Sequence, residues 1–164
     1  MPRERKPKPT LPRDAFASGI GLLARREHSS RELAAKLSRK GLEKADVRDA
    51  VDRLKEKRYQ SDDRFGVVIA RTRVAQGYGP LRVRAELRSH GLSEAQIRAA
   101  IDATEADWAS IAAAQVRRRF GTKGAADASE RARRAQFLLR RGFDPATVRA
   151  VTRAVVDDPG EEFD

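Results

Sequence analysis

Apolar residues recur along this chain at the spacing of amphipathic helices, and the sequence pattern of one helical unit is repeated. Its clearest copy covers residues 77–92, GYGPLRVRAELRSHGL. Gly79 stands where an N-cap is favoured, and Pro80 occupies the first helical position, where a missing N–H is harmless. Apolar residues four apart supply a buried edge, and Gly91 ends the helix because glycine readily adopts a positive φ.

The same stop signal recurs at a nearly constant interval. Gly41, Gly91 and Gly142 lie 50 and 51 residues apart, each with a leucine four residues before it and an apolar residue directly after it. A period near 50 residues in a helical chain is typical of a tandem array of small helical units. We therefore expect an all-α protein, built as an elongated tandem array of three three-helix repeats.

The chain divides into five predicted segments. The third repeat is divergent, because its middle helix reaches the stop glycine fifteen residues after its start at Asp127, against twelve in the other two repeats. The segments are a disordered basic arm (1–13), three three-helix repeats (14–60, 61–104 and 105–156) and an acidic tail (157–164).

Capping signals mark where several helices begin. Ser29 with Glu32, and Ser93 with Gln96, have the spacing of capping boxes, and Asp127 is the N-cap expected in the third repeat. Each pair places an acceptor at the N-cap and a second polar side chain at the third helical position. We expect a helix to start at each of these signals.

The first helix of the second repeat is expected over residues 61–76. Phe65 and Val68 are assigned to its buried face by their spacing. Asp62 and Asp63 open it, and adjacent residues on a helix point in different directions, so we interpret them as helix-capping acids and not as a catalytic pair.

Positive charge is the strongest compositional feature of the chain. Its formal net charge is +11. The charges of the basic arm (+4) and the acidic tail (−5) nearly cancel, so residues 14–156 alone carry +12. Such a charge favours a polyanionic partner, although a basic surface kept for solubility would have the same composition.

Arginines in the first and second helices of the repeats are the candidate binding residues. Stacked repeats would bring equivalent helices to one side of the array, where guanidinium groups can hold phosphates through paired hydrogen bonds. Each of them could instead be a solvated residue with a nearby carboxylate, as the spacing of Arg82 and Glu86 suggests. The candidates are Arg25, Arg26, Arg31, Arg71, Arg73, Arg82, Arg84, Arg88, Arg117, Arg118 and Arg119.

No set of residues indicates catalysis, a cofactor or a metal site. The chain has no cysteine, and neither His28 nor His90 has a partner at the spacing that a metal site would need. We interpret both histidines as structural, and we expect a cytoplasmic protein that is not an enzyme. The longest apolar run is far too short to cross a membrane.

Three short segments resemble the RecX family of bacterial regulatory proteins, which modulate the RecA recombinase. The resemblance covers roughly residues 15–155 and is most specific in the first two repeats. The matching residues are Arg31, Glu32, Leu33, Leu37, Lys40 and Gly41; then Asp62, Asp63, Arg64 and Phe65; then Gly77, Tyr78, Gly79, Pro80, Arg84, Glu86, Leu87 and Gly91.

This resemblance implies a crescent of helical repeats that lies in the groove of the RecA filament on single-stranded DNA. It implies inhibition of ATP hydrolysis and strand exchange, filament disassembly, and restraint of recombination and the SOS response. Binding to single-stranded and double-stranded DNA is also implied. We expect the protein to act as a monomer.

Two other functions are compatible with the residues. A three-helix unit with a glycine turn is similar to a helix-turn-helix, so a general DNA-binding protein that does not act through RecA is the main alternative. A repeat scaffold for an acidic protein is the other. Preference for a duplex sequence would favour the first, and binding that ignores DNA would favour the second.

Overall fold

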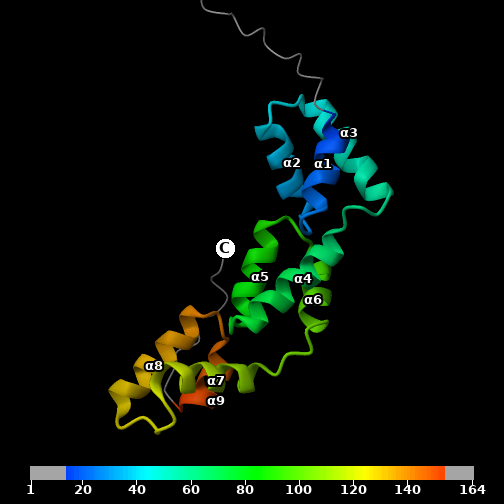
Figure 1. Ribbon diagram of the computed structural model, residues 1–164. Helices are drawn as coiled ribbons and strands as arrows, with labels where there is room; N and C mark the ends of the chain where they lie inside the picture. The colour runs from blue at the N-terminus through cyan, green and yellow to red at the C-terminus, as the bar shows by residue number, and fades with distance from the viewer. Residues whose placement is uncertain (1–13, 154–164) are drawn as a thin grey trace, which may run out of the picture. The chain divides into compact units, whose positions relative to one another are not determined.

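Helices make up the whole regular structure of the described chain. The computed structural model describes residues 14–153, which hold nine α-helices and no strand (Figure 1). The predicted all-α class is therefore confirmed, while the basic arm and the acidic tail lie outside the described residues. The helices are α1 Ala15–Leu23, α2 Ser30–Arg39, α3 Lys44–Glu56, α4 Asp62–Ala75, α5 Pro80–Ser89, α6 Glu94–Asp102, α7 Trp108–Phe120, α8 Ala128–Arg140 and α9 Pro145–Thr152.

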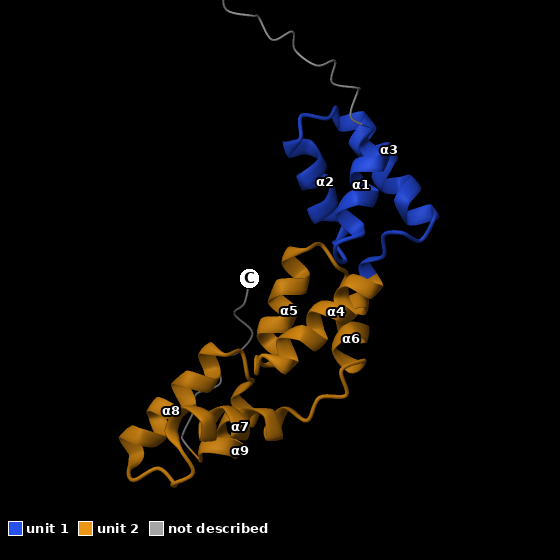
Figure 2. Cartoon of the chain, viewed as in Figure 1, with its two compact units in different colours: residues 1–62 blue, residues 63–164 orange. Residues whose placement is uncertain are grey.

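Three helices at a time surround an apolar cluster of their own. The chain divides between Asp62 and Asp63 into two compact units (Figure 2). Unit 1 contains α1 to α3 around one cluster, and unit 2 contains α4 to α6 and α7 to α9 around two further clusters. The prediction of three three-helix repeats is confirmed, whereas their residue limits and the elongated shape stay predictions.

The helix ends follow the local signals in the sequence. The Ser29 hydroxyl accepts a hydrogen bond from the Glu32 N–H at 3.0 Å. Ser93 and Gln96 form both halves of a capping box, and Asp127 caps α8. All three stop glycines have positive φ, between 80° and 87°. α8 is three residues longer than α5, as its later stop glycine predicts.

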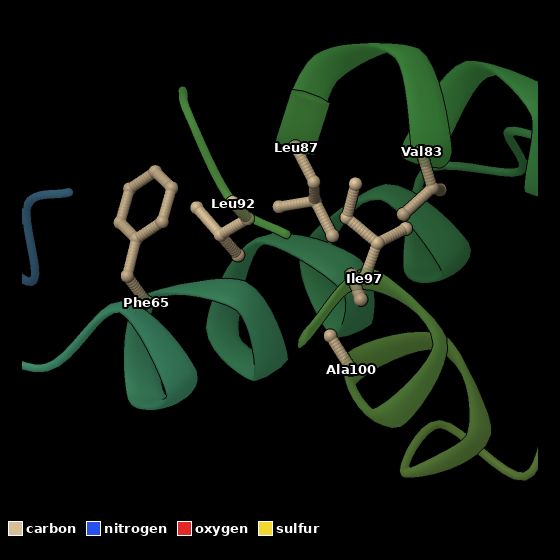
Figure 3. Packing of buried hydrophobic residues seen from close by; sticks show 7 residues of the cluster. Phe65, Val83, Leu87, Leu92, Ile97 and Ala100 are labelled. Atoms are coloured by element: carbon tan, nitrogen blue, oxygen red, sulfur yellow. The ribbon is translucent and has the colours of Figure 1, made fainter. Parts of the chain in front are cut away.

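The second repeat shows how each core is assembled. Phe65 and Ala70 of α4 belong to one buried cluster with residues of α5, of α6 and of the turn between them. Figure 3 labels Phe65 together with the members of the cluster that come from α5, the turn and α6. Val68 was wrongly assigned to this core, because 47% of it is exposed. The buried face of α4 is centred between Phe65 and Ala70, and at 3.6 residues per turn Val68 lies roughly 130° from that centre.

Asp62 caps a helix, but not the one that it begins. Its carboxylate accepts a hydrogen bond from the Ser30 N–H at 2.8 Å and another from the Gln60 side chain at 2.9 Å. Ser30 is the first residue of α2, so Asp62 satisfies one of the N–H groups that α2 leaves unpaired. The capping interpretation therefore holds for Asp62 on α2, within unit 1.

Glu32 connects the start of α2 to two basic side chains. It accepts hydrogen bonds from the Arg26 guanidinium and lies 3.3 Å from the Lys36 ammonium. Partial burial alone would raise the pKa of Glu32, but the hydrogen bonds from Arg26 and Lys36 outweigh it and lower this pKa to about 2.

The second and third repeats meet through their backbones. The N–H groups of Gly79 and Leu81 donate to the carbonyls of Arg141 and Gly142, at 2.8 and 2.9 Å. The N-terminus of α5 is thus capped by the segment that ends α8, and the two helix dipoles meet with opposite signs. A Cβ at Gly142 would lie 2.6 Å from the backbone nitrogen of Arg82, so only glycine fits.

Gly142→Ala should destabilise the protein more than the equivalent Gly41→Ala. Both positions have positive φ, but a Cβ at Gly41 meets no atom within 4 Å, whereas at Gly142 it meets the α5 backbone. We expect Gly41→Ala to cost about 1 kcal/mol of strain and Gly142→Ala at least about 2 kcal/mol.

Urea unfolding followed by far-UV circular dichroism measures both changes. Fluorescence of Trp108, the single tryptophan, reports on unit 2 separately. Equal losses in the two variants would show that the close approach at Gly142 adds nothing to the backbone strain.

Glu32 should make unit 1 sensitive to acid. Because its folded pKa of about 2 lies below the ordinary value of 4.5, its contribution is fully present above about pH 4.5 and is lost as the pH falls towards 2. Glu32→Gln should lower the free energy of unfolding by on the order of 1 kcal/mol at pH 6 and by almost nothing near pH 2.

Urea titrations between pH 2 and 6 test this dependence. Glu43→Gln is the control, since Glu43 begins α3 without a side-chain capping bond. A difference between wild type and Glu32→Gln that does not change with pH would contradict the assignment.

Candidate nucleic-acid interface

Three pockets of unit 2 adjoin one another, because neighbouring pockets share lining residues, and we describe the three together as one groove. The first has a volume of about 540 Å³ and is formed by α4 and α5; the second, of about 780 Å³, lies where the second repeat meets the third. The third, of about 650 Å³, lies between α7 and α8. Gln76 and Tyr78 line both the first and second pockets, and Arg119 and Phe137 line both the second and third.

Arginine dominates the lining of this groove, which we call the arginine groove. The only acidic residue among the lining residues of the three pockets is Glu86. The groove therefore presents a strongly positive surface to solvent. Its arginines are Arg73, Arg82, Arg118, Arg119, Arg133, Arg140 and Arg141.

Tyr78 holds two of these guanidinium groups at the centre of the groove. The guanidinium carbon of Arg82 lies 4.5 Å from the ring centroid of Tyr78, and that of Arg141 lies 4.4 Å from it. Both distances are within the range of a cation–π contact. One ring from the second repeat thus positions an arginine from each of two repeats.

Arg141 is fixed by backbone acceptors as well as by the ring. Its guanidinium donates to the carbonyl oxygens of Gln76 and Gly77, at 2.6 and 3.2 Å, and to the side-chain oxygen of Gln115 at 3.1 Å. These carbonyls follow the end of α4, where a cation is favoured by the helix dipole. Arg141 is therefore a structural link between repeats that also adds charge to the groove.

Arg73 shares its charge with the acidic residue of the groove. It donates two hydrogen bonds to the Glu86 carboxylate, at 2.6 and 2.7 Å. These bonds raise the pKa of Arg73 and lower that of Glu86. The alternative reading of Arg82 as an ion-pair partner of Glu86 is not what the structure shows: Glu86 binds Arg73, and the guanidinium of Arg82 lies over the ring of Tyr78.

Four of the predicted arginines line the groove, and the others are found elsewhere. Arg84 and Arg88 both bind Glu94, at 2.9 and 2.7 Å, outside the three pockets. Arg71 and Arg117 are exposed but line none of these pockets. The arginines of the groove that were predicted are Arg73, Arg82, Arg118 and Arg119; those placed in unit 1 are Arg25, Arg26 and Arg31.

Three arginines of the groove were missed by the sequence analysis. Arg133 and Arg140 lie on α8, the second helix of the third repeat, and candidate binding residues were expected on such helices. The high number of arginines on α8 is the only sequence signal that indicates them. Arg141 precedes a stop glycine, at the position that Lys40 and His90 hold in the other repeats. Its partners are up to 65 residues away, so no local signal identifies it.

The two histidines occupy structural positions. His28 is buried, its Nδ1 lies 3.0 Å from the Arg26 carbonyl oxygen, and burial lowers its pKa. His90 follows α5 and packs against Phe65, with 4.8 Å between the ring centroids. In the described residues, 14–153, no three His, Asp or Glu side chains are grouped as a metal site would require.

The helices in the described part of the chain are too short or too polar to cross a membrane.

Comparison with known proteins identifies the three repeats. The chain matches family models described as the first, second and third three-helix domains of RecX, over residues 15–54, 61–101 and 105–152.

Named relatives cover most of the chain. Regulatory protein RecX of Xanthomonas axonopodis pv. citri (strain 306) is 46% identical over 139 residues, which are 85% of this chain and 86% of that protein. Regulatory protein RecX of Stenotrophomonas maltophilia (strain K279a) is 45% identical over 156 residues, or 95% and 94% of the two chains.

Solved structures share the fold. The crystal structure of RecX from Lactobacillus salivarius has a TM-score of 0.70 at 14% identity and covers 85% of this chain and 92% of its own. A second crystal structure, of a regulatory protein RecX, has a TM-score of 0.72 at 19% identity and covers 85% and 70%. With family models that match all three repeats and relatives about 45% identical, this chain belongs to the RecX family of regulatory proteins.

Proposed function

We propose that this protein regulates a RecA recombinase by binding its filament on single-stranded DNA. In this proposal it inhibits the ATPase and strand-exchange activities of the filament, promotes filament disassembly, and so restrains recombination and the SOS response. Membership of the RecX family supports the regulatory role. The protein acts as a monomer in the cytoplasm, through binding and not through catalysis of its own.

The arginine groove is the observation that carries the binding part of the proposal. Seven arginines line three connected pockets, and one acidic residue lies among them. Each phosphate that they neutralise releases condensed counterions from DNA, which gives favourable binding at low salt. Guanidinium groups also match the geometry of phosphate oxygens with two parallel hydrogen bonds.

Preorganisation makes this groove a better anion site than scattered surface arginines. Arg141 and Arg82 are held on Tyr78, so little side-chain freedom is lost when a phosphate binds. Arg84 and Arg88 already share the carboxylate of Glu94 and would have to give up that partner. On α5, this argument favours Arg82 over Arg84 and Arg88 as a phosphate contact.

Inhibition follows if the protein prefers one arrangement of the filament. A ligand shifts an equilibrium only by the difference between its affinities for the two states. Contacts that span DNA and recombinase in the inactive arrangement would hold the filament there. No enzymatic step by the bound protein is needed.

A general DNA-binding protein is the alternative, since the groove supplies charge without any element specific for RecA. Such a protein would compete for the strand itself and would inhibit any ATPase that needs it. The two functions differ in the amount of protein required and in their specificity for the filament.

Substitution of three exposed groove arginines should weaken inhibition. The variant Arg82→Ala, Arg118→Ala, Arg119→Ala should need at least about tenfold more protein for half-inhibition of the ATPase of a RecA filament on single-stranded DNA. The slope of log affinity for single-stranded DNA against log salt should fall by about 2, because each lost phosphate contact contributes about 0.7.

The triple variant Arg71→Ala, Arg84→Ala, Arg88→Ala is the matched control, because it also removes three charges and all three residues lie outside the groove. A second DNA-dependent ATPase tests specificity. Inhibition of the RecA filament alone, with fewer protein molecules than RecA protomers, supports the proposal. Equal inhibition of both ATPases identifies a general DNA-binding protein, and equal potency of the two variants removes the groove from the site.

A further inference from the structure

The last pocket of the arginine groove, between α7 and α8, has a wall of two phenylalanine rings. Phe120 and Phe137 line it and pack edge to face, with ring centroids 5.6 Å apart. Arg134 lies against Phe120 at 5.5 Å and Arg141 against Phe137 at 5.8 Å. These contacts hold both rings in place, as a preformed binding site requires.

Polar groups lie around this apolar wall. Gln136 and Ser129 line the pocket and are exposed, so their amide and hydroxyl groups can both donate and accept hydrogen bonds. Arg119, Arg133 and Arg140 line it as well and are also exposed. The pocket thus combines an aromatic surface, neutral hydrogen-bonding groups and cations within about 650 Å³.

We propose that this pocket binds one unstacked nucleobase of a single strand whose phosphates follow the arginine groove. The proposal rests on the proposed function for the presence of a DNA strand and adds a site for one of its bases. A nucleobase needs a flat apolar surface and hydrogen-bonding partners at its edge, and its phosphates need cations nearby. The third repeat supplies all three in one place.

Single-stranded nucleic acid fits the pocket better than the other polyanions. A base in a DNA duplex is stacked on both sides. It cannot enter the pocket between α7 and α8 without being flipped out of the duplex. An acidic peptide would match the arginines but would leave the two phenylalanine rings without a flat partner. A free strand has both the charge and the unstacked base.

The base cannot be placed as easily at Tyr78. Two guanidinium groups lie on the ring of Tyr78, at 4.5 and 4.4 Å, whereas Phe120 and Phe137 each have one, at 5.5 and 5.8 Å. A base stacked on Tyr78 would have to displace one of the two. In this proposal the arginines around Tyr78 bind phosphates of the strand, and the pocket between α7 and α8 binds one of its bases.

Oligonucleotides without bases provide the direct test. Fluorescence anisotropy of the full-length protein would compare a labelled oligothymidylate with an abasic oligonucleotide of equal length and equal charge. The thymidine strand should bind at least about fivefold more tightly, the lower end of what one stacked base contributes. Equal affinities would overturn the proposal, and so would failure to bind either strand.

Two variants locate the preference in the pocket. Phe137→Leu removes one ring, and Ala132→Leu fills the pocket from an exposed position without removing a core contact. In both, the ratio of the two affinities should fall towards 1, while affinity for the abasic strand stays within about twofold. An unchanged ratio in Ala132→Leu, with its Trp108 emission like that of wild type, would overturn the assignment.

Arg149→Ala is the control, because it removes one charge from the same repeat but lies on α9 outside the three pockets. Its ratio should equal that of wild type. A polyglutamate peptide that displaces the oligothymidylate and the abasic strand equally well at matched charge would identify an acidic-protein site and overturn the nucleobase assignment. The filament ATPase assay remains independent, so loss of the base preference leaves the regulatory proposal standing.

Discussion

The close approach of two backbones, at Gly79 and Gly142, determines the geometry of unit 2. Two N–H groups at the start of α5 donate to carbonyls at the end of α8, so each helix end satisfies groups that the other leaves unpaired. The contact tolerates no Cβ at Gly142, where the α5 backbone lies against it. The contact places the end of α8 against the start of α5, so Arg141 lies over the ring of Tyr78 together with Arg82.

A groove lined by seven arginines creates repulsion that the fold has to offset. Tyr78 lowers this cost by presenting its ring to Arg82 and Arg141, and the carbonyls after α4 accept hydrogen bonds from Arg141. Glu86 neutralises Arg73. The remaining arginines are exposed, where water screens their mutual repulsion. Arg73, Arg82 and Arg141 are thus held by partners, whereas the other four arginines of the groove are exposed.

Elements defined by neighbours three or four residues apart could be predicted closely from the sequence. Ser93 and Gln96 form the expected capping box, and the extra turn of α8 appears as the late position of its stop glycine indicates. Errors arose where a choice depended on packing. Val68 has helical spacing from Phe65 but lies away from the centre of the buried face. The capping role of Asp62 holds, but the helix that it caps is α2. Neither outcome can be read from spacing alone.

The sequence by itself determined the helices, their grouping in threes and the amount of positive charge, because caps, stop glycines and apolar periodicity act over short distances along the chain. Only the tertiary structure decided which arginines share a site. Glu86 binds Arg73, thirteen residues away, although Arg82 is four residues away, and Arg141 reaches a carbonyl 65 residues distant. A long, flexible guanidinium can reach several partners from one helix position. Its actual partner depends on which elements pack beside that helix, and the charge pattern does not contain this information.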